Sequence, residues 1–164
     1  RRSITCEDYK ALCAAACASG YIDLIDVEAF MQDGLLASVC GIAHNNGVFV
    51  VGSNHDFEKT PNETDIVARL RYMDEQGADI PKIAVMPQKE RDVLTLLSAT
   101  LTYHEAGGTK PIVTMSMNDI GMVSRLAGEL FGSALTFATV GRTSAPGQIP
   151  IDEARQSLTI LHRQ

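Results

Sequence analysis

A lysine within an apolar run is the residue of this chain best suited to covalent chemistry. Lys82 lies in the segment IPKIAVM at 80–86. An ammonium group is costly to bury among apolar side chains, and burial favours the neutral amine. A neutral lysine amine is a nucleophile that can form an imine with a ketone. The structural alternative is a lysine that pairs with a carboxylate, for which Asp26 and Glu28 are candidates.

A histidine ends the apolar run that comes about one βα unit earlier. His55 lies in the segment SNHDF at 53–57. Histidine can give and take protons near neutral pH, and the flanking Asn54 and Asp56 are expected to orient its ring by hydrogen bonds. The structural alternative is a loop histidine bonded to the backbone. Lys82 and His55 on neighbouring strand ends would together suit imine chemistry assisted by proton transfer.

Two segments further along the chain could bind or enclose an anionic ligand. Arg125, in SRLAGE at 124–129, could bind a carboxylate with two hydrogen bonds. Its alternative is a surface ion pair with Glu129, four residues on. The segment TSAPGQ at 143–148 has the small residues of a loop that closes over a ligand, although an ordinary turn has a similar composition.

Alternating apolar runs and helical stretches must position these residues. We predict strands at 21–27, 48–53, 81–86, 111–117 and 134–140, and helices at 7–19, 33–45, 62–76, 89–105, 118–131 and 152–162. The strand starts are about 23 to 33 residues apart, which is the size of a βα unit. Continuous apolar strands indicate a parallel sheet, in a (β/α)₈ barrel or an open doubly wound fold. No GxGxxG follows the first strand, which disfavours dinucleotide binding.

Composition indicates one globular domain over residues 1–164. The chain is 45% hydrophobic and 21% charged, with a net charge of −6. This acidic balance argues against nucleic acid as a partner. The four cysteines form no CxxC pattern, so we expect free thiols and no metal site. No apolar run reaches membrane length and no signal peptide is evident, so we expect a cytoplasmic protein without membrane contact.

Five segments in order resemble one enzyme family. They are SNHDF at 53–57, IPKIAVMPQ at 80–88, PIVTMSM at 111–117, SRLAGELFGSA at 124–134 and SAPGQI at 144–149. They are similar to type I 3-dehydroquinate dehydratase, a (β/α)₈ barrel that is usually a homodimer. The resemblance implies a lyase of the shikimate pathway of aromatic amino acid biosynthesis. Such a lyase removes water from 3-dehydroquinate to give 3-dehydroshikimate.

The resemblance also implies a role for each matched residue. Lys82 would form a Schiff base with the substrate ketone, and His55 would be the general acid and base. Arg125 would bind the substrate carboxylate, while Ser144 and Gln148 would contact the substrate from a lid. No metal or organic cofactor is implied, since the lysine itself supplies the electrophilic activation.

The length of the chain departs from the family pattern. A complete barrel takes about 250 residues, so we expect about five C-terminal βα units with the first three strands absent. An incomplete barrel should self-associate and turn over substrate weakly or not at all. Gly52 replaces the usual bulkier residue and is expected to loosen packing behind His55. A lysine-imine aldolase-like enzyme and a non-catalytic assembly module remain as alternative functions.

Overall fold

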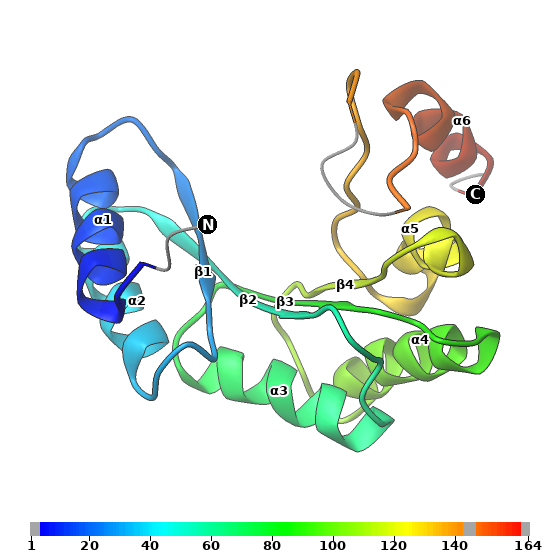
Figure 1. The fold of residues 1–164 in the computed structure, drawn as a ribbon, viewed down its shortest axis with the longest axis horizontal. Helices are drawn as coiled ribbons and strands as arrows, with labels where there is room; N and C mark the ends of the chain where they lie inside the picture. The colour runs from blue at the N-terminus through cyan, green and yellow to red at the C-terminus, as the bar shows by residue number, and fades with distance from the viewer. Residues whose placement is uncertain (1–3, 143–146, 162–164) are drawn as a thin grey trace.

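A parallel four-stranded sheet forms the centre of the fold. The computed structural model describes residues 4–142 and 147–161. The strands lie side by side in chain order and every neighbouring pair is parallel (Figure 1). They are β1 (Leu24–Glu28), β2 (Phe49–Asp56), β3 (Ile80–Val85) and β4 (Val113–Ser116). The predicted α/β class and the first four predicted strands are therefore confirmed.

Helices follow the strands and cover one face of the sheet. Helices α3 and α4 lie beneath it in Figure 1, α1 packs on α2 beyond β1, and α5 (Met122–Leu126) and α6 lie beyond β4. Thr5 caps α1, because its side chain accepts a hydrogen bond from the backbone N–H of Asp8 at 3.1 Å. The longer helices are α1 (Cys6–Ala18), α2 (Leu35–Asn45), α3 (Glu63–Glu75), α4 (Glu90–Glu105) and α6 (Ile151–Leu161).

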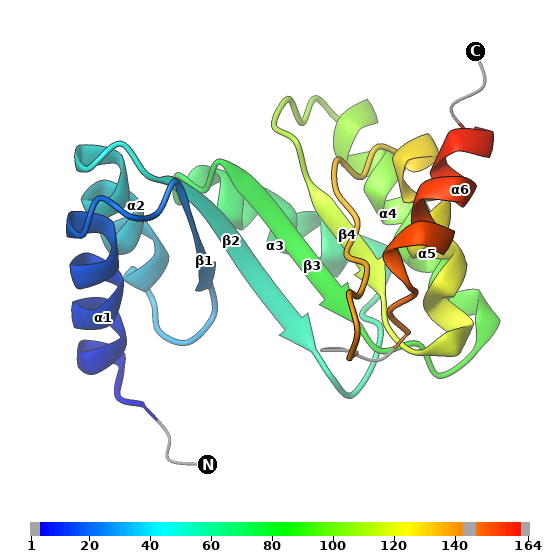
Figure 2. The same ribbon diagram turned by 90° about the horizontal axis from the view of Figure 1, so that it is seen from above.

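The main core lies between the sheet and helices α2 to α4. Alternate residues of each strand point into it, because successive side chains of a strand face opposite sides. Val27, Val50, Ile83 and Val85 point this way and are completely buried. The strand residues between them point to the other face, which we call the open face. Figure 2 looks onto this face, where β1 and β2 are uncovered and the chain after residue 133 lies over β4.

The fifth predicted strand, 134–140, is not a strand in the structure. Ser133 forms one isolated bridge with Ile112, and then the chain leaves the edge of β4. Near the end of the same segment, Thr139 forms another isolated bridge, with Pro150. A strand needs a continuous hydrogen-bonding neighbour, and an apolar run alone does not supply one. The segment therefore crosses the open face as extended chain.

The predicted helix at 118–131 is broken into short pieces. These are the 3₁₀ turns η1 (Asp119–Gly121) and η2 (Gly128–Phe131), with α5 between them. Gly121 lies so close to β4 that an added Cβ would be 2.2 Å from the carbonyl oxygen of Ser116. This close approach holds α5 against the end of β4. A single straight helix over 118–131 would not allow it.

Packing behind His55 is tight, which contradicts the expectation of loose packing at Gly52. A Cβ on Gly52 would lie 2.8 Å from the Cβ of Ala78 and 3.2 Å from Leu36. The space that a larger side chain would need is already filled, so the glycine fits its surroundings. Within the described residues, no helix is long and apolar enough to cross a membrane.

Candidate active site

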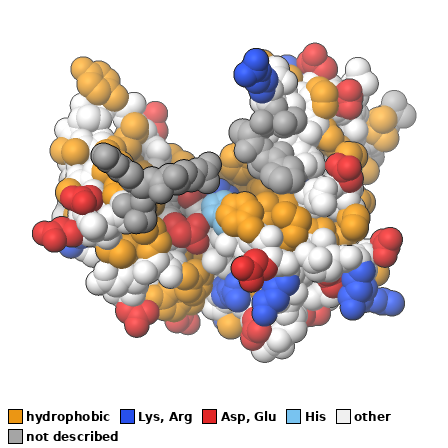
Figure 3. All heavy atoms as spheres, in the orientation of Figure 1, with side chains coloured by type: hydrophobic (Ala, Val, Ile, Leu, Met, Phe, Trp, Pro, Cys, Tyr) orange, Lys and Arg blue, Asp and Glu red, His pale blue; other side chains and the backbone are white. Residues whose placement is uncertain are grey.

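Polar side chains of three neighbouring strands gather on the open face. Asp26 and Glu28 alternate on β1, His55 follows on β2, and Lys82 lies on β3. The strand register places Glu28, Ser53 and Lys82 in one row across the open face, with Asp26 in the row before it and His55 in the row after it. Figure 3 shows the molecule hollowed above the sheet, with a histidine next to hydrophobic side chains.

Lys82 is buried and its charge is paired. The residue is 7% exposed, and its Nζ donates a hydrogen bond to Oδ2 of Asp26 at 2.6 Å. Ser53 donates to the other oxygen of the same carboxylate. The ring of Phe137, from the segment that crosses the open face, lies 5.3 Å from Nζ. The carboxylate pairing that the structural alternative described is therefore present, with Asp26 rather than Glu28 as the partner, and it places the amine in a small polar site with an aromatic wall.

His55 is held by a carboxylate and an aromatic ring. Its Nδ1 lies 2.7 Å from Oε2 of Glu28, and its ring stacks on Phe57 with centroids 5.9 Å apart and an interplanar angle of 11°. An ionised carboxylate can only accept hydrogen bonds. In the neutral imidazole, a hydrogen bond between them places the proton on Nδ1 and leaves the Nε2 lone pair available.

The expectation that Asn54 and Asp56 orient His55 is wrong. Asn54 accepts a hydrogen bond from Arg69 of α3 at 2.8 Å. Asp56 accepts from the backbone N–H groups of Glu58 and Lys59, within its own loop. Side chains adjacent to His55 along a strand point away from its face, so they reach α3 and the loop instead.

A recess of about 500 Å³ lies where β1 and β2 end. Glu28 and His55 form its polar wall, and Phe57 lies beside them. A ring-shaped ligand in this recess would contact the imidazole directly. Its lining is completed by Phe30, Met31 and Asn54.

Arg125 is almost completely buried, which contradicts the surface position that the alternative gave to it. It is 2% exposed, and its Nη1 lies 3.5 Å from the sulfur of Met115. Met115 is in register with Ala84, two residues after Lys82 on the same face. Burial lowers the pKa of Arg125, but guanidinium keeps its proton in proteins. The arrangement brings a buried cation to the face that carries Lys82.

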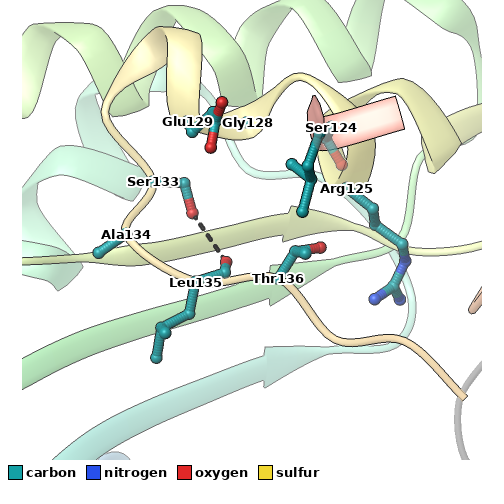
Figure 4. A pocket seen from close by; sticks show the side chains of 9 residues that line it. Ser124, Arg125, Gly128, Glu129, Ser133, Ala134, Leu135 and Thr136 are labelled. Carbon is teal, nitrogen blue, oxygen red and sulfur yellow. Dashed lines mark hydrogen bonds between the residues drawn. The ribbon is translucent and has the colours of Figure 1, made fainter. Parts of the chain in front are cut away.

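Arg125 also borders a second cavity, of about 260 Å³, between α5 and the chain at 133–136. In Figure 4 its guanidinium extends toward the sheet, whereas Ser133 lies on the opposite side of the cavity. The Ser133 hydroxyl donates a hydrogen bond to the carbonyl of Leu135 at 3.3 Å. This hydroxyl helps to hold the turn where the chain leaves β4.

Only part of the predicted lid can be located. Ser144 lies outside the described residues. Gln148 is half-buried, next to Ile149, whose carbonyl accepts a hydrogen bond from the N–H of Thr139 at 2.8 Å. A Cβ on Gly147 would be 2.5 Å from the carbonyl oxygen of Asn118. The end of the lid segment is therefore anchored next to the residue that leads into η1 and α5.

Two site residues were missed or misassigned in the sequence analysis. Glu28 was considered only as a partner for Lys82, although its spacing of two residues from Asp26 places both carboxylates on one strand face. Phe137 was missed, and no sequence signal identifies it, because it reaches Lys82 by a crossing segment rather than by a strand. Within residues 4–142 and 147–161, no group of three His, Cys, Asp or Glu side chains could hold a metal ion.

Comparisons with known proteins agree with this geometry. The family model of type I 3-dehydroquinase matches residues 1–164. The chain is 54% identical over 162 residues to 3-dehydroquinate dehydratase from Salmonella agona, covering 99% of this chain and 64% of that protein. The chain thus spans just under two thirds of the length of the curated relatives it matches.

Solved structures give the same result. A type I 3-dehydroquinate dehydratase from Clostridium difficile, determined with covalently modified comenic acid, superposes with a TM-score of 0.94 at 49% identity. The match covers 99% of this chain and 64% of that one. 3-Dehydroquinate dehydratase from Geobacillus kaustophilus gives 0.93 at 41% identity, with 99% and 63% covered. The chain belongs to the type I 3-dehydroquinase family.

Proposed function

We propose that this chain carries the catalytic centre of a 3-dehydroquinate dehydratase that works through a lysine Schiff base. The observation that carries the proposal is the buried Lys82 amine, paired with Asp26 on the face that also holds His55. Membership of the family and the names of the relatives support the same reaction.

The proposed reaction begins when the Lys82 ammonium passes a proton to its partner Asp26, and the resulting neutral amine attacks the substrate ketone. A carbon–nitrogen bond forms, and the ketone oxygen leaves as water, which gives an imine. The protonated imine withdraws electrons and acidifies the adjacent C–H. His55 takes that proton through Nε2 and returns a proton to the departing hydroxyl, which leaves as water. Hydrolysis of the imine then releases the product and regenerates the amine.

We propose that Arg125 binds the substrate carboxylate. A buried guanidinium offers two parallel hydrogen bonds to such a group, and burial strengthens their attraction. Ser144 and Gln148 would contact the substrate from the lid and exclude water. The reaction as written needs no metal or organic cofactor, because the protonated imine is the electron sink.

We further propose that the sheet is part of a (β/α)₈ barrel, of which this single domain supplies about five C-terminal units. Parallel strands in chain order with helices on one face support this, as does the superposition on longer relatives. The remaining wall of the barrel would come from polypeptide outside residues 1–164. The chain by itself would then form the imine but turn over slowly.

A homodimer and a cytoplasmic location complete the proposal. All four cysteines are free in the structure, and Cys13, Cys17 and Cys40 are buried. Reduced thiols of this kind are usual in a reducing compartment. The proposed partner is the small-molecule substrate, with no membrane and no nucleic acid involved.

Borohydride trapping tests the lysine. We expect incubation with 3-dehydroquinate and borohydride to add the mass of the reduced substrate adduct at Lys82, located by peptide mass spectrometry. Lys82→Met should abolish the adduct, whereas Lys10→Met, which removes an exposed amine of α1, should leave it unchanged.

The same experiment separates the alternatives. An adduct formed only with a different carbonyl compound would favour an aldolase-like enzyme. The absence of any adduct at Lys82 would contradict the proposed chemistry and favour a non-catalytic module.

A further inference from the structure

We infer that Arg69 is a positioning residue, which holds the loop after β2 in the shape that places Phe57 on the wall of the recess. This loop, residues 57–62, joins β2 to α3, and Arg69 reaches its beginning from α3. The importance of the Phe57 ring to a bound substrate rests on the proposed function, whereas the contacts that hold the ring do not.

The position of Phe57 is not set by burial of its own ring. Phe57 is 64% exposed, yet its ring stacks on that of His55 with centroids 5.9 Å apart, and it lines the recess. A largely exposed ring gains little from the removal of apolar surface from water. Its place therefore depends on the backbone that carries it, and so on the hydrogen bonds of the loop.

Asp56 folds the beginning of the loop. Its Oδ1 accepts hydrogen bonds from the backbone N–H groups of Glu58 at 3.2 Å and Lys59 at 3.0 Å. Aspartate commonly forms turns of this kind with the backbone that follows it. Phe57 lies inside the turn, directly after Asp56. The direction of its side chain therefore depends on where the Asp56 carboxylate is held.

Arg69 holds that carboxylate and the strand residue before His55. Its Nη1 donates a hydrogen bond to Oδ1 of Asn54 at 2.8 Å and lies 3.7 Å from Oδ2 of Asp56. Asn54 is 8% exposed and the Asp56 side chain 15% exposed, so water cannot readily replace the guanidinium. One charged group thus holds both side chains on the helix side of β2, and Oδ1 of Asp56 remains bonded to the loop.

The later part of the loop is attached to the next βα unit. The backbone N–H of Met86 donates to the carbonyl of Lys59 at 3.3 Å, and Nε2 of Gln88 donates to the carbonyl of Glu58 at 2.8 Å. These bonds hold the loop after Phe57, whereas Asp56 and Arg69 hold it before Phe57. Loss of Arg69 should therefore release the ring without releasing the whole loop.

Proton NMR of the His55 ring tests this arrangement without substrate. His55→Gln identifies the signals, and Phe57→Leu gives their positions when no aromatic ring is stacked on the imidazole. We expect Arg69→Met to move the His55 signals most of the way to those positions. Arg69→Lys keeps the charge but not the planar fork of the guanidinium, so it should move them only part of the way.

Arg71→Met is the matched control. Arg71 lies on the same helix, but it donates to the carbonyl of Ala106 at 2.6 Å, at the end of α4. The control should leave the His55 signals where they are. Unchanged signals in Arg69→Met, or an equal shift in Arg71→Met, would overturn the inference. If Arg69→Met does not fold, unchanged signals in Arg69→Lys overturn it in the same way.

Substrate binding tests the consequence for the recess. We expect the concentration of 3-dehydroquinate that gives half the maximal rate of borohydride trapping to rise about 3- to 10-fold in Arg69→Met, which is the size of one aromatic contact. The maximal rate itself should not change, because Lys82 is paired with Asp26 on the open face. Arg71→Met should change neither quantity.

The two measurements separate the inference from the proposed function. An unchanged half-saturating concentration in Arg69→Met, or a loss confined to the maximal rate, overturns the inference. Failure of trapping in the unaltered chain overturns the proposed function instead, and the His55 signals then decide whether Arg69 positions Phe57.

Discussion

At the scale of single residues, Lys82 and His55 are each paired with a carboxylate of β1. Lys82 is both an ion-paired lysine and a candidate nucleophile, and the two descriptions are compatible. The ion pair with Asp26 offsets the cost of burying the ammonium. A substrate ketone would enter a site where the amine is already held in place, which reduces the entropy lost on reaction.

The thiol of Cys40 shows how burial alone changes the chemistry of a residue. Cys40 is 3% exposed, in α2. Burial, together with the negative charge of Asp79, raises the pKa of its thiol to about 11, although the positive charge of Lys110 opposes this shift. The folded state therefore holds the thiol proton more tightly than the unfolded chain, whose thiol has a pKa of 9.0. The stability linked to this thiol is complete below pH 9 and is lost as the pH rises from 9 to 11.

Cys40→Ala should remove this part of the alkaline instability. The free energy of unfolding of the unaltered chain should fall by up to about 2–3 kcal/mol more than that of the variant across this pH range. Urea denaturation at pH 7 and at pH 10.5 measures the difference between the two proteins. An equal loss of stability in both would show that the buried thiol does not contribute.

At the scale of elements, close backbone approach positions Arg125. Gly121 lies against Ser116 at the end of β4, and the Ser124 hydroxyl accepts a hydrogen bond from the Ser116 N–H at 2.8 Å. The same hydroxyl donates to the carbonyl of Gly121 at 2.7 Å. These contacts attach α5 to the strand end, and Arg125 follows directly. A short helix of this kind depends on such contacts, because it has few hydrogen bonds of its own.

Gly121→Ala should therefore displace α5. The added methyl group would overlap backbone, which cannot move aside as a flexible side chain can. We expect a loss of about 1–3 kcal/mol of unfolding free energy, together with weaker binding of the carboxylated substrate in calorimetry. Gly41→Ala is the matched control, since no atom lies within 4 Å of the added Cβ in α2. It should stabilise by about 0.5–1 kcal/mol; an equal effect of both changes would contradict the proposed contact.

At the scale of the whole molecule, the helices bury one face of the sheet more completely than the other. Phe49 is 60% exposed and Leu24 is 45% exposed on the open face, and they are directly opposite each other on β1 and β2. Exposed apolar side chains that lie next to each other favour association with another molecule. We therefore expect this face to be where a second copy of the chain packs.

Phe49→Glu should weaken self-association of the chain. We expect sedimentation velocity at micromolar concentration to show association of the unaltered chain and about 10-fold weaker association of the variant. Burial of one large apolar side chain is worth about 1.5–3 kcal/mol, which is the basis of this estimate. Leu94→Glu, which changes a similarly exposed residue of α4, should associate as the unaltered chain does. A chain that is monomeric at these concentrations would contradict the prediction.

The amino-acid sequence was enough to predict four strands, most of the helices and the chemistry-bearing residues Lys82 and His55. Short apolar runs of about strand length predicted β1 to β4, because each of these strands carries buried side chains that face the helices. Lys82 and His55 were identifiable because a cation and a titratable ring are unusual in such runs. The resemblance to the family rested on segments that surround these same residues.

Which side chains contact one another could be learned only from the three-dimensional fold. Partner choice depends on strand register and on which face each side chain takes, so Glu28 rather than Asn54 or Asp56 reaches His55. The segment at 134–140 is apolar enough for a strand, but pairing needs a neighbour along its whole length, and it crosses the open face instead. That path brings Phe137 to Lys82. Such contacts join residues far apart in the chain, and spacing along the sequence carries no information about them.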